Sequence, residues 1–359
     1  MKDGWKHLYG VIGASENLNF GPIKVGNQDN EVYSVTYKEL SAIFSNTSFT
    51  DYKTMTKDVV IRYLLDHQKV VESMMNSHSI IPFKFGSLAH SEKDVERILT
   101  QGYTLFKPLL PWVRERVEFE LVASWDREKV FKALYEEESE IRSLQKNIGT
   151  KSEEDALLEK IKLGKLVQQY LIKRKVLFKD KILSQLKGCT ESQCDHDVMD
   201  DLMILNMGFL LRREMESEFD QKVQYLDQTF LGEVCLKLVG PLPLYSFQCI
   251  EIEWVEAKEI REALALLGLK EQVSLADIRN AYYQKAHSLH PDKTGEPLNS
   301  VSEFEKLAEA YKFFRKYYNQ HRSFPREDRI LLMEVRTNGS NYCRKEDEEG
   351  GGKSYRHGR

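Results

Sequence analysis

The chain has 359 residues, of which 41% are hydrophobic and 30% are charged. This length exceeds what a single hydrophobic core usually supports, so two or more folding units are expected. A formal net charge of −4 gives no bulk reason to expect a polyanion, which argues against nucleic acid as a partner.

The apolar runs of the chain are short. The longest, residues 204–211 and 263–267, fall far below the roughly 18 to 20 residues that a membrane-spanning helix needs. Residues 1–15 contain no sustained apolar segment and no cleavage site, so a secretory signal is not expected. These features predict a cytoplasmic protein that does not contact a membrane.

Five cysteines are scattered along the chain, and this odd number predicts reduced thiols rather than a disulfide framework. Cys189, Cys194 and His196 form the one close grouping of soft metal ligands. Three ligands without a CxxC pair favour a polar interdomain loop over a zinc site. We therefore expect no metal and no cofactor.

Strand and helix patterns alternate along the first 124 residues. Strands are predicted at residues 8–12, 32–37, 80–85 and 117–122, and helices begin near Lys57 and Ser91. Gly102 is expected to end the second helix, and His67, on the apolar face of the first, is interpreted as a packed structural histidine. Phe83 and Phe85 would share one face of their strand. The alternation indicates helices packed on a sheet, in an α/β or α+β arrangement.

Charged residues dominate from Asp126, and apolar residues recur there at the three-and-four spacing of coiled coils. One helix is predicted over residues 126–148 and a second over 153–186. Gly149 and Thr150 separate them, so the two should fold back as an antiparallel hairpin. The abundant Glu and Lys are interpreted as a solvated face, with a partner-binding stripe as the alternative.

A second small α+β unit is predicted after the hairpin. It contains a strand near 204–211, a helix near 214–230, and paired strands at 234–239 and 247–254. Between the paired strands lies the segment Gly240-Pro241-Leu242-Pro243-Leu244-Tyr245-Ser246. Its two prolines lack backbone donors, so this segment must turn or bulge rather than pair regularly.

Four segments, taken in order, resemble the GvpF/GvpL family of gas-vesicle proteins. They are Leu8-Tyr9-Gly10-Val11-Ile12, the His67 helix with Val70, Val71 and Glu72, Ile81-Pro82-Phe83-Lys84-Phe85-Gly86-Ser87-Leu88, and Leu238-Val239-Gly240-Pro241-Leu242-Pro243-Leu244-Tyr245-Ser246-Phe247. The resemblance covers roughly residues 1–256. It implies a ferredoxin-like first domain and a second domain that combines helices with a small α+β unit. It also implies a non-catalytic role in building the shell of an intracellular gas compartment.

The partners implied by this resemblance are the apolar shell subunit and other vesicle accessory proteins. Contiguous exposed apolar surface causes association, so a protein that holds such a subunit before assembly is physically reasonable. Candidate client contacts are the motif residues Phe83, Phe85, Pro241, Pro243, Tyr245 and Phe247. For the four aromatic residues, core packing is favoured over client contact, because alternating aromatics usually fill the inner face of a sheet.

Residues 258–320 resemble a J-domain. A short helix ends at Gly268, a second runs from Ser274 to His290-Pro291-Asp292-Lys293, and a third begins at Ser300. By this resemblance His290, Pro291 and Asp292 contact a DnaK-type ATPase chaperone and stimulate ATP hydrolysis, and Arg279, Lys285 and Lys293 are the nearby cations.

This J-domain resemblance has two departures. Tyr283 and Gln284 stand where J-domains usually carry a basic pair, and no fourth helix is recognisable after His321. A fold retained only for docking is therefore the alternative to chaperone coupling.

The predicted fold class is α+β with a C-terminal all-α module. The expected units are residues 1–124 (ferredoxin-like), 125–190 (helical hairpin), 191–256 (second α+β unit), 257–321 (J-domain) and 322–359 (largely flexible tail). The predicted function is that of a gas-vesicle assembly factor, located at the vesicle and in the cytoplasm, that recruits the chaperone to the shell subunit. A general J-domain co-chaperone is the alternative, and an enzyme using Cys189, Cys194 and His196 is disfavoured.

Overall fold

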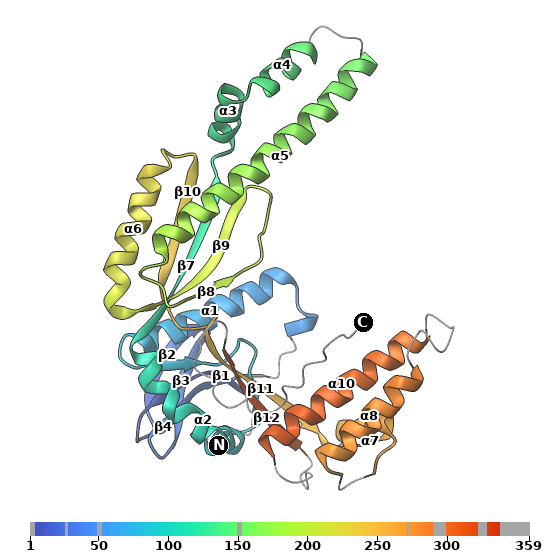
Figure 1. Cartoon of the computed structure of the whole chain (residues 1–359). Helices are drawn as coiled ribbons and strands as arrows, with labels where there is room; N and C mark the ends of the chain where they lie inside the picture. The colour runs from blue at the N-terminus through green and yellow to red at the C-terminus, as the bar shows by residue number, and fades with distance from the viewer. Residues whose placement is uncertain are drawn as a thin grey trace, which may run out of the picture.

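The computed structural model describes residues 4–25, 28–48, 52–148, 153–270, 273–289, 299–321 and 329–337. These residues form an N-terminal body around one sheet, a second sheet with a projecting helical hairpin, and a C-terminal helical module (Figure 1). Helices and antiparallel sheets occur together, as expected for the α+β class.

The sheet of the N-terminal body is antiparallel, with the order β2-β3-β4-β1-β5 and with β6 also paired to β1. Its strands are β1 (Lys6–Gly13), β2 (Asn19–Val25), β3 (Gln28–Tyr37), β4 (Leu40–Asn46), β5 (Ile80–Pro82) and β6 (Leu88–Ala89). The predicted strands at 8–12 and 32–37 are confirmed as parts of β1 and β3. β2 and β4 were not predicted from sequence.

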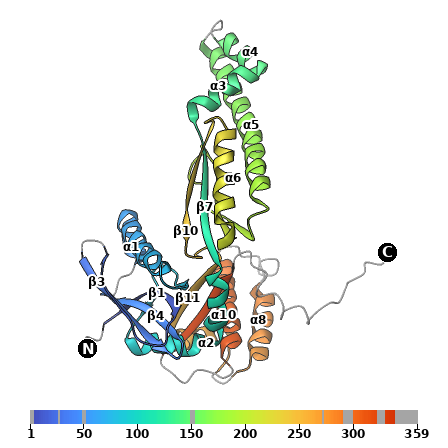
Figure 2. The ribbon, with the colours of Figure 1, turned by 90° about the vertical axis from the view of Figure 1, so that its left-hand side faces the viewer.

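Two helices cover opposite faces of this sheet (Figure 2). α1 (Lys57–Met75) packs Val70 and Val71 against Tyr9 and Ile12, whereas α2 (Glu92–Arg114) belongs to the core on the other face. A short 3-10 helix, η1 (Tyr52–Thr54), precedes α1. The ferredoxin-like arrangement expected for this domain is not confirmed.

The expectation that Gly102 ends the second helix is wrong, because α2 continues to Arg114 with Pro108 and Pro111 inside it. A Cβ at Gly102 would lie 2.2 Å from the Phe106 ring. The glycine therefore makes room for a buried aromatic ring of the same helix instead of closing the helix. The start of α2 follows the prediction, since the Asp94 N–H donates to Ser91 Oγ at 3.2 Å.

The second sheet has the order β10-β7-β9-β8. Its strands are β7 (Arg116–Trp125), β8 (Ser192–Asp195), β9 (Met203–Arg212) and β10 (Val234–Leu242). The strand predicted at 117–122 is β7, and it lies in this sheet rather than in the first. η2 (Arg213–Met215) leads into α6 (Glu216–Thr229), and α6 and the end of α5 share one hydrophobic core with the sheet.

The hairpin consists of α3 (Arg127–Glu137), α4 (Ser139–Ile148) and α5 (Glu153–Leu186), and it projects beyond the second sheet (Figures 1 and 2). The single helix predicted over 126–148 is interrupted at Glu138, whose backbone is extended with φ −97° and ψ 107°. The coiled-coil spacing does not reveal this break, because it constrains side-chain periodicity and not the backbone angles of one residue.

The strands predicted to pair at 234–239 and 247–254 do not pair with each other. β10 pairs with β7, whereas β11 (Gln248–Glu256) pairs along its whole length with β12 (Arg329–Thr337). The expectation of a largely flexible tail over 322–359 is therefore wrong for the nine residues of β12. The predicted irregularity near the prolines is confirmed, since the β10 register shifts between Val239 and Leu242.

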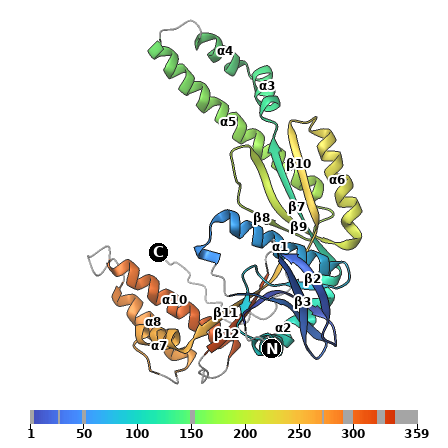
Figure 3. The same cartoon turned by 180° about the vertical axis from the view of Figure 1, so that it is seen from behind.

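The C-terminal module lies between β11 and β12 in the chain and contains α7 (Ala257–Leu267), α8 (Leu275–Leu289) and α10 (Asn299–Gln320) (Figure 3). Gly268, in the left-handed conformation with φ 72°, caps α7 as predicted. Ser274 and Asp277 exchange hydrogen bonds at the start of α8. Tyr282 and Tyr311 stack between α8 and α10, with ring centroids 4.4 Å apart.

Within the described residues, no helix is both long enough and apolar enough to span a lipid bilayer.

Candidate functional site

The four motif segments meet around His67 on α1, and each contributes a ring there. His67 Nδ1 lies 2.9 Å from His7 Nε2, and the Tyr9 ring stacks on the His67 ring with centroids 5.4 Å apart. The rings of Phe85 and Tyr245 lie 5.7 Å and 6.2 Å from it. Segments that are up to about 240 residues apart in sequence thus share one buried cluster, which we call the His67 cluster.

Both histidines of the His67 cluster are held neutral. Burial, together with the proximity of His67, lowers the pKa of His7 from 6.5 to about 3. Burial also lowers the pKa of His67 from 6.5 to about 4. A neutral pair can share one hydrogen bond between the two rings, whereas two charged rings would repel. The prediction of a packed structural histidine therefore agrees with the geometry.

The proline-rich turn is tied to the second sheet by the buried Glu118. The backbone N–H of Ser246 donates to Glu118 Oε2 at 2.9 Å, and the Ser246 hydroxyl donates to Oε1 at 2.5 Å. Burial raises the pKa of Glu118 from 4.5 to about 7, although both hydrogen bonds from Ser246 act in the opposite direction. Because desolvation is the larger effect, this carboxyl group is a proton-binding group near neutral pH.

Glu118 belongs to a polar group that sequence reasoning missed. Glu118, Glu120 and His196 can bring one ligand atom each within 4.8 Å of one another, and Ser246 Oγ lies 3.3 Å from His196 Nε2. Strand periodicity could not reveal it, because Val117, Phe119 and Leu121 face the hydrophobic core and Glu118 and Glu120 therefore read as residues of the polar face. In contrast, the Cys189 thiol contacts the Leu186 carbonyl oxygen at 3.1 Å in the hydrophobic core of the second sheet.

The ribbon formed by β11 and β12 joins the body to the C-terminal module. Leu331 and Met333 of β12 are buried in the core of the N-terminal body, whereas Ile330 and Leu332 are buried in the core of the C-terminal helices. Alternate residues of a strand point to opposite faces, so this one strand contributes to both cores. The N-terminal body and the C-terminal helices therefore pack against the same ribbon of β11 and β12.

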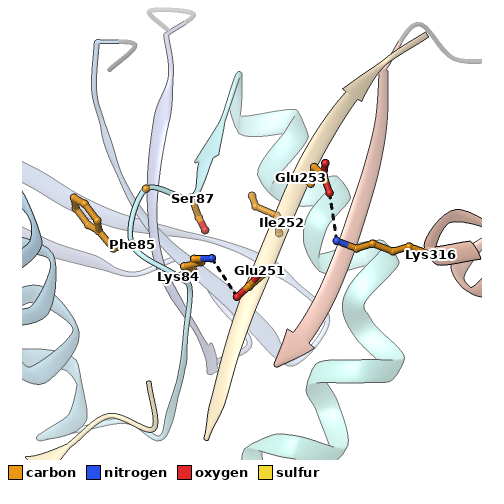
Figure 4. Close-up of a pocket in the computed structure, with 8 residues that line it drawn as sticks. Lys84, Phe85, Ser87, Glu251, Ile252, Glu253 and Lys316 are labelled. Atoms are coloured by element: carbon orange, nitrogen blue, oxygen red, sulfur yellow. Dashed lines mark hydrogen bonds and ion pairs between the residues drawn. The ribbon is translucent and has the colours of Figure 1, made fainter. Parts of the chain in front are cut away.

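A groove lies where the motif loop, the ribbon and α10 meet (Figure 4). It has a volume of about 260 Å³, and the residues that line it are Lys84, Phe85, Gly86, Ser87, Glu251, Ile252, Glu253 and Lys316. A neighbouring groove of about 490 Å³ shares Glu251, Glu253 and Lys316 with it. Lys316 thus brings the C-terminal module to the wall of a groove built from the family motif.

Charges in the groove are paired across its walls. Lys84 Nζ lies 3.3 Å from Glu251 Oε1, and Lys316 Nζ lies 3.3 Å from Glu253 Oε2. Each pair joins one exposed and one partly buried side chain, so solvent screens both pairs and each contributes little to stability. Among the described residues that line the groove there is no His or Cys. The groove is therefore lined by paired carboxylate and ammonium groups.

Three of the six predicted client-contact residues are buried, and Phe85 and Tyr245 are half-buried. Phe83 and Phe247 are fully buried in the core beneath α2, and Pro243 is buried too, whereas Pro241 is exposed. Phe83 and Phe85 do not share one face as expected, because β5 ends at Pro82 and the chain then turns Phe85 toward the His67 cluster.

The predicted chaperone-contact residues divide into two groups. His290, Pro291, Asp292 and Lys293 lie outside the described residues. On α8 the Arg279 guanidinium lies over the Tyr283 ring, 5.8 Å from its centroid, and Lys285 Nζ donates to the Leu266 carbonyl at the end of α7 at 2.6 Å. Lys285 thus has a structural contact that the sequence did not suggest.

Two family profiles match the chain. The profile described as gas vesicle synthesis protein GvpL/GvpF matches residues 6–248, and the DnaJ domain profile matches residues 262–322. Gas vesicle protein F of Microcystis aeruginosa is 26% identical over 251 residues, which are 67% of this chain and 96% of that protein. Gas vesicle protein F of Dolichospermum flosaquae is 27% identical, over 52% of this chain and 76% of that protein.

A solved structure has the same fold over the first two thirds of the chain. The crystal structure of the gas vesicle protein GvpF from Anabaena sp. PCC7120 aligns with a TM-score of 0.52 and 22% identity, covering 68% of this chain and 97% of that one. The GvpL/GvpF match covers more than half of the chain, and it contains the residues of the His67 cluster. The chain therefore belongs to the gas vesicle GvpL/GvpF family, and it carries a DnaJ domain behind the family region.

Proposed function

We propose that this protein assists gas-vesicle assembly in the cytoplasm by holding the apolar shell subunit and bringing a DnaK-type chaperone to it. The observation that supports this most is the ribbon. Leu331 and Leu332, adjacent on β12, are buried in the family core and in the DnaJ-domain core respectively. A chaperone that binds the DnaJ domain would therefore meet the client at a defined position.

The client surface that we favour is the first half of α1. Ile61, Tyr63, Leu64 and Leu65 are 40% to 48% exposed there, next to the His67 cluster, although they are large apolar side chains. The motif aromatics are less suitable, because Phe83 and Phe247 are buried and the rings of Phe85 and Tyr245 pack in the His67 cluster. An apolar shell subunit would cover this part of α1 and would itself be shielded from aggregation.

The test uses the full chain, since cutting at residue 256 would remove β12 and uncover both cores. The tagged protein is co-expressed with the shell subunit and purified. Leu64→Asp should abolish co-purification of the shell subunit, whereas Leu105→Asp should not, because Leu105 is equally exposed at 44% but lies on α2. Equal retention by both variants would contradict the assigned surface.

The chaperone step is tested separately. His290→Gln should abolish stimulation of the DnaK-type ATPase while leaving co-purification of the shell subunit unchanged. Unaltered ATPase stimulation in the variant would contradict the proposed role of the DnaJ domain. The general co-chaperone hypothesis predicts that the tagged protein captures unrelated denatured proteins as well as it captures the shell subunit. Adding such proteins to the tagged protein before purification measures this.

A further inference from the structure

One face of α5 carries large apolar side chains that the described residues leave about half exposed. Leu157, Leu158, Ile161, Ile172 and Val176, which we call the outer stripe, are 49% to 59% exposed. Their spacing places them on one side of the helix, because residues three and four apart share a face. Figures 1 and 2 show α3 and α4 beside α5, and the α5 residues that contact this segment, Tyr170 and Arg174 (to Glu140 and Glu137), are not in the outer stripe.

Beyond its acidic first turns (Glu153, Glu154, Asp155 and Glu159), the same helix is basic in a chain whose net charge is −4. Residues 160–181 contain eight Lys or Arg and one acidic residue, Asp180. Three of the cations have carboxylate partners within the chain, since Lys162 pairs with Glu159, Arg174 with Glu137 and Glu233, and Lys179 with Asp195.

The remaining cations include side chains next to the outer stripe. Within the described ranges, no carboxylate lies in ion-pair distance of Lys165, Lys173 or Lys175. Lys173 instead lies over the Tyr170 ring, 5.5 Å from its centroid. These positive charges beside exposed apolar residues favour a negatively charged partner over a neutral one.

Gly164 lies along α5 between Ile161 and Ile172, at the edge of the outer stripe, three residues after Ile161 and four before Gln168. A Cβ built at this position would meet no atom within 4 Å. Glycine weakens a helix interior relative to alanine, and the packing of the described part of the chain gives no reason for it. A second helix that crosses here could approach the α5 backbone closely, because the side chains at the crossing set the interaxial distance.

We propose that the outer stripe of α5 docks an acidic amphipathic helix of a partner protein. The apolar ridge of that helix would cross at Gly164, and its carboxylates would face Lys165, Lys173 and Lys175. An anionic membrane is less suited to this face, since the outer stripe lacks the Trp and Phe that insert into lipid and a central glycine adds nothing to insertion. Such a helix would bind this face whether or not the shell subunit is the client of the protein.

The test measures binding of a labelled synthetic helix to the full chain by fluorescence anisotropy. The probe is a 21-residue peptide with Leu and Ile along one face and Glu on both flanks, and the control peptide has Lys in place of every Glu. We expect saturable binding of the acidic peptide alone, weakened by added salt. Ile172→Gln should weaken it about tenfold or more, because a central apolar contact is lost.

Two further variants make the result specific. Leu177→Gln is the matched control, since Leu177 is 68% exposed on α5 but lies off the outer stripe, and it should leave binding within about twofold. Gly164→Ala should raise the thermal midpoint of the protein, because alanine favours helix, and yet weaken peptide binding. Loss of affinity together with gained stability distinguishes docking from misfolding.

Three results would contradict the proposal, and two of them would assign the outer stripe to a different partner. Equal binding of both peptides would overturn the proposal. Binding to vesicles of phosphatidylglycerol without binding to the acidic peptide would assign the outer stripe to lipid instead. Self-association in sedimentation experiments that Ile172→Gln abolishes would assign it to a second copy of this chain.

Discussion

Gln320 at the end of α10 hydrogen-bonds both backbone polar groups of Met333 on β12. Its side-chain nitrogen donates to the Met333 carbonyl at 2.5 Å, and its side-chain oxygen accepts from the Met333 N–H at 2.8 Å. One amide thus pairs with the strand edge as a neighbouring strand would, and an edge that is covered in this way resists pairing with other chains. The same contact connects the DnaJ domain to the body.

Two adjacent residues of β12 should report on two different cores. Leu331→Ala and Leu332→Ala each remove a buried leucine side chain and should each lower the free energy of unfolding by about 2–5 kcal/mol. Hydrogen exchange should then increase in α2 for Leu331→Ala and in α7 and α10 for Leu332→Ala. The same exchange pattern in both variants would show that the ribbon does not separate the cores.

Gly10, in the first motif segment, should not tolerate a side chain. A Cβ there would lie 2.5 Å from Ile80 Cγ1 and 2.9 Å from the Ile81 carbonyl oxygen, so β1 and β5 would have to separate. Gly10→Ala should destabilise the protein by about 1–3 kcal/mol in thermal or chemical unfolding. Gly13→Ala is the control, because its nearest neighbour, Leu110 Cδ1, is at an ordinary 3.5 Å and little change is expected.

Glu118 should make the protein less stable as the pH rises. Its pKa is about 7 in the folded protein and 4.5 ordinarily, so folding favours the protonated form. The stability that this protonated form provides is complete below pH 4.5 and is lost as the pH rises to about 7, a change of about 3 kcal/mol. Glu118→Gln cannot ionise, so its unfolding free energy relative to wild type should increase across this window. If the difference in unfolding free energy between Glu118→Gln and wild type did not change with pH, this would argue against the raised pKa of Glu118.

The His67 cluster should have the opposite pH dependence. His7 and His67 have pKa values of about 3 and about 4 in the folded protein and 6.5 ordinarily, so folding favours their neutral forms. Their contribution is complete above pH 6.5 and falls by about 1.4 kcal/mol per pH unit for each histidine below it. His67→Gln should be less stable at pH 7.5 but should lose less stability on acidification, as measured by urea unfolding at several pH values.

The sequence alone predicted much of the local structure and the family. Capping at Ser91 and Ser274 and the glycine end of α7 follow from hydrogen bonds between residues only a few positions apart. The four motif segments were sufficient to indicate the GvpF/GvpL resemblance, and the position of His-Pro-Asp between two amphipathic helices indicated the DnaJ domain.

The tertiary structure alone determined which distant segments meet. β12 lies 73 residues beyond the end of β11, and Glu118 is 128 residues from Ser246, so no local pattern could pair them. Strand periodicity shows which side chains share a face but not which strand becomes the neighbour, because any edge can offer the same backbone hydrogen bonds. The ribbon that unites the family region with the DnaJ domain was therefore hidden in a segment that composition predicted to be a flexible tail.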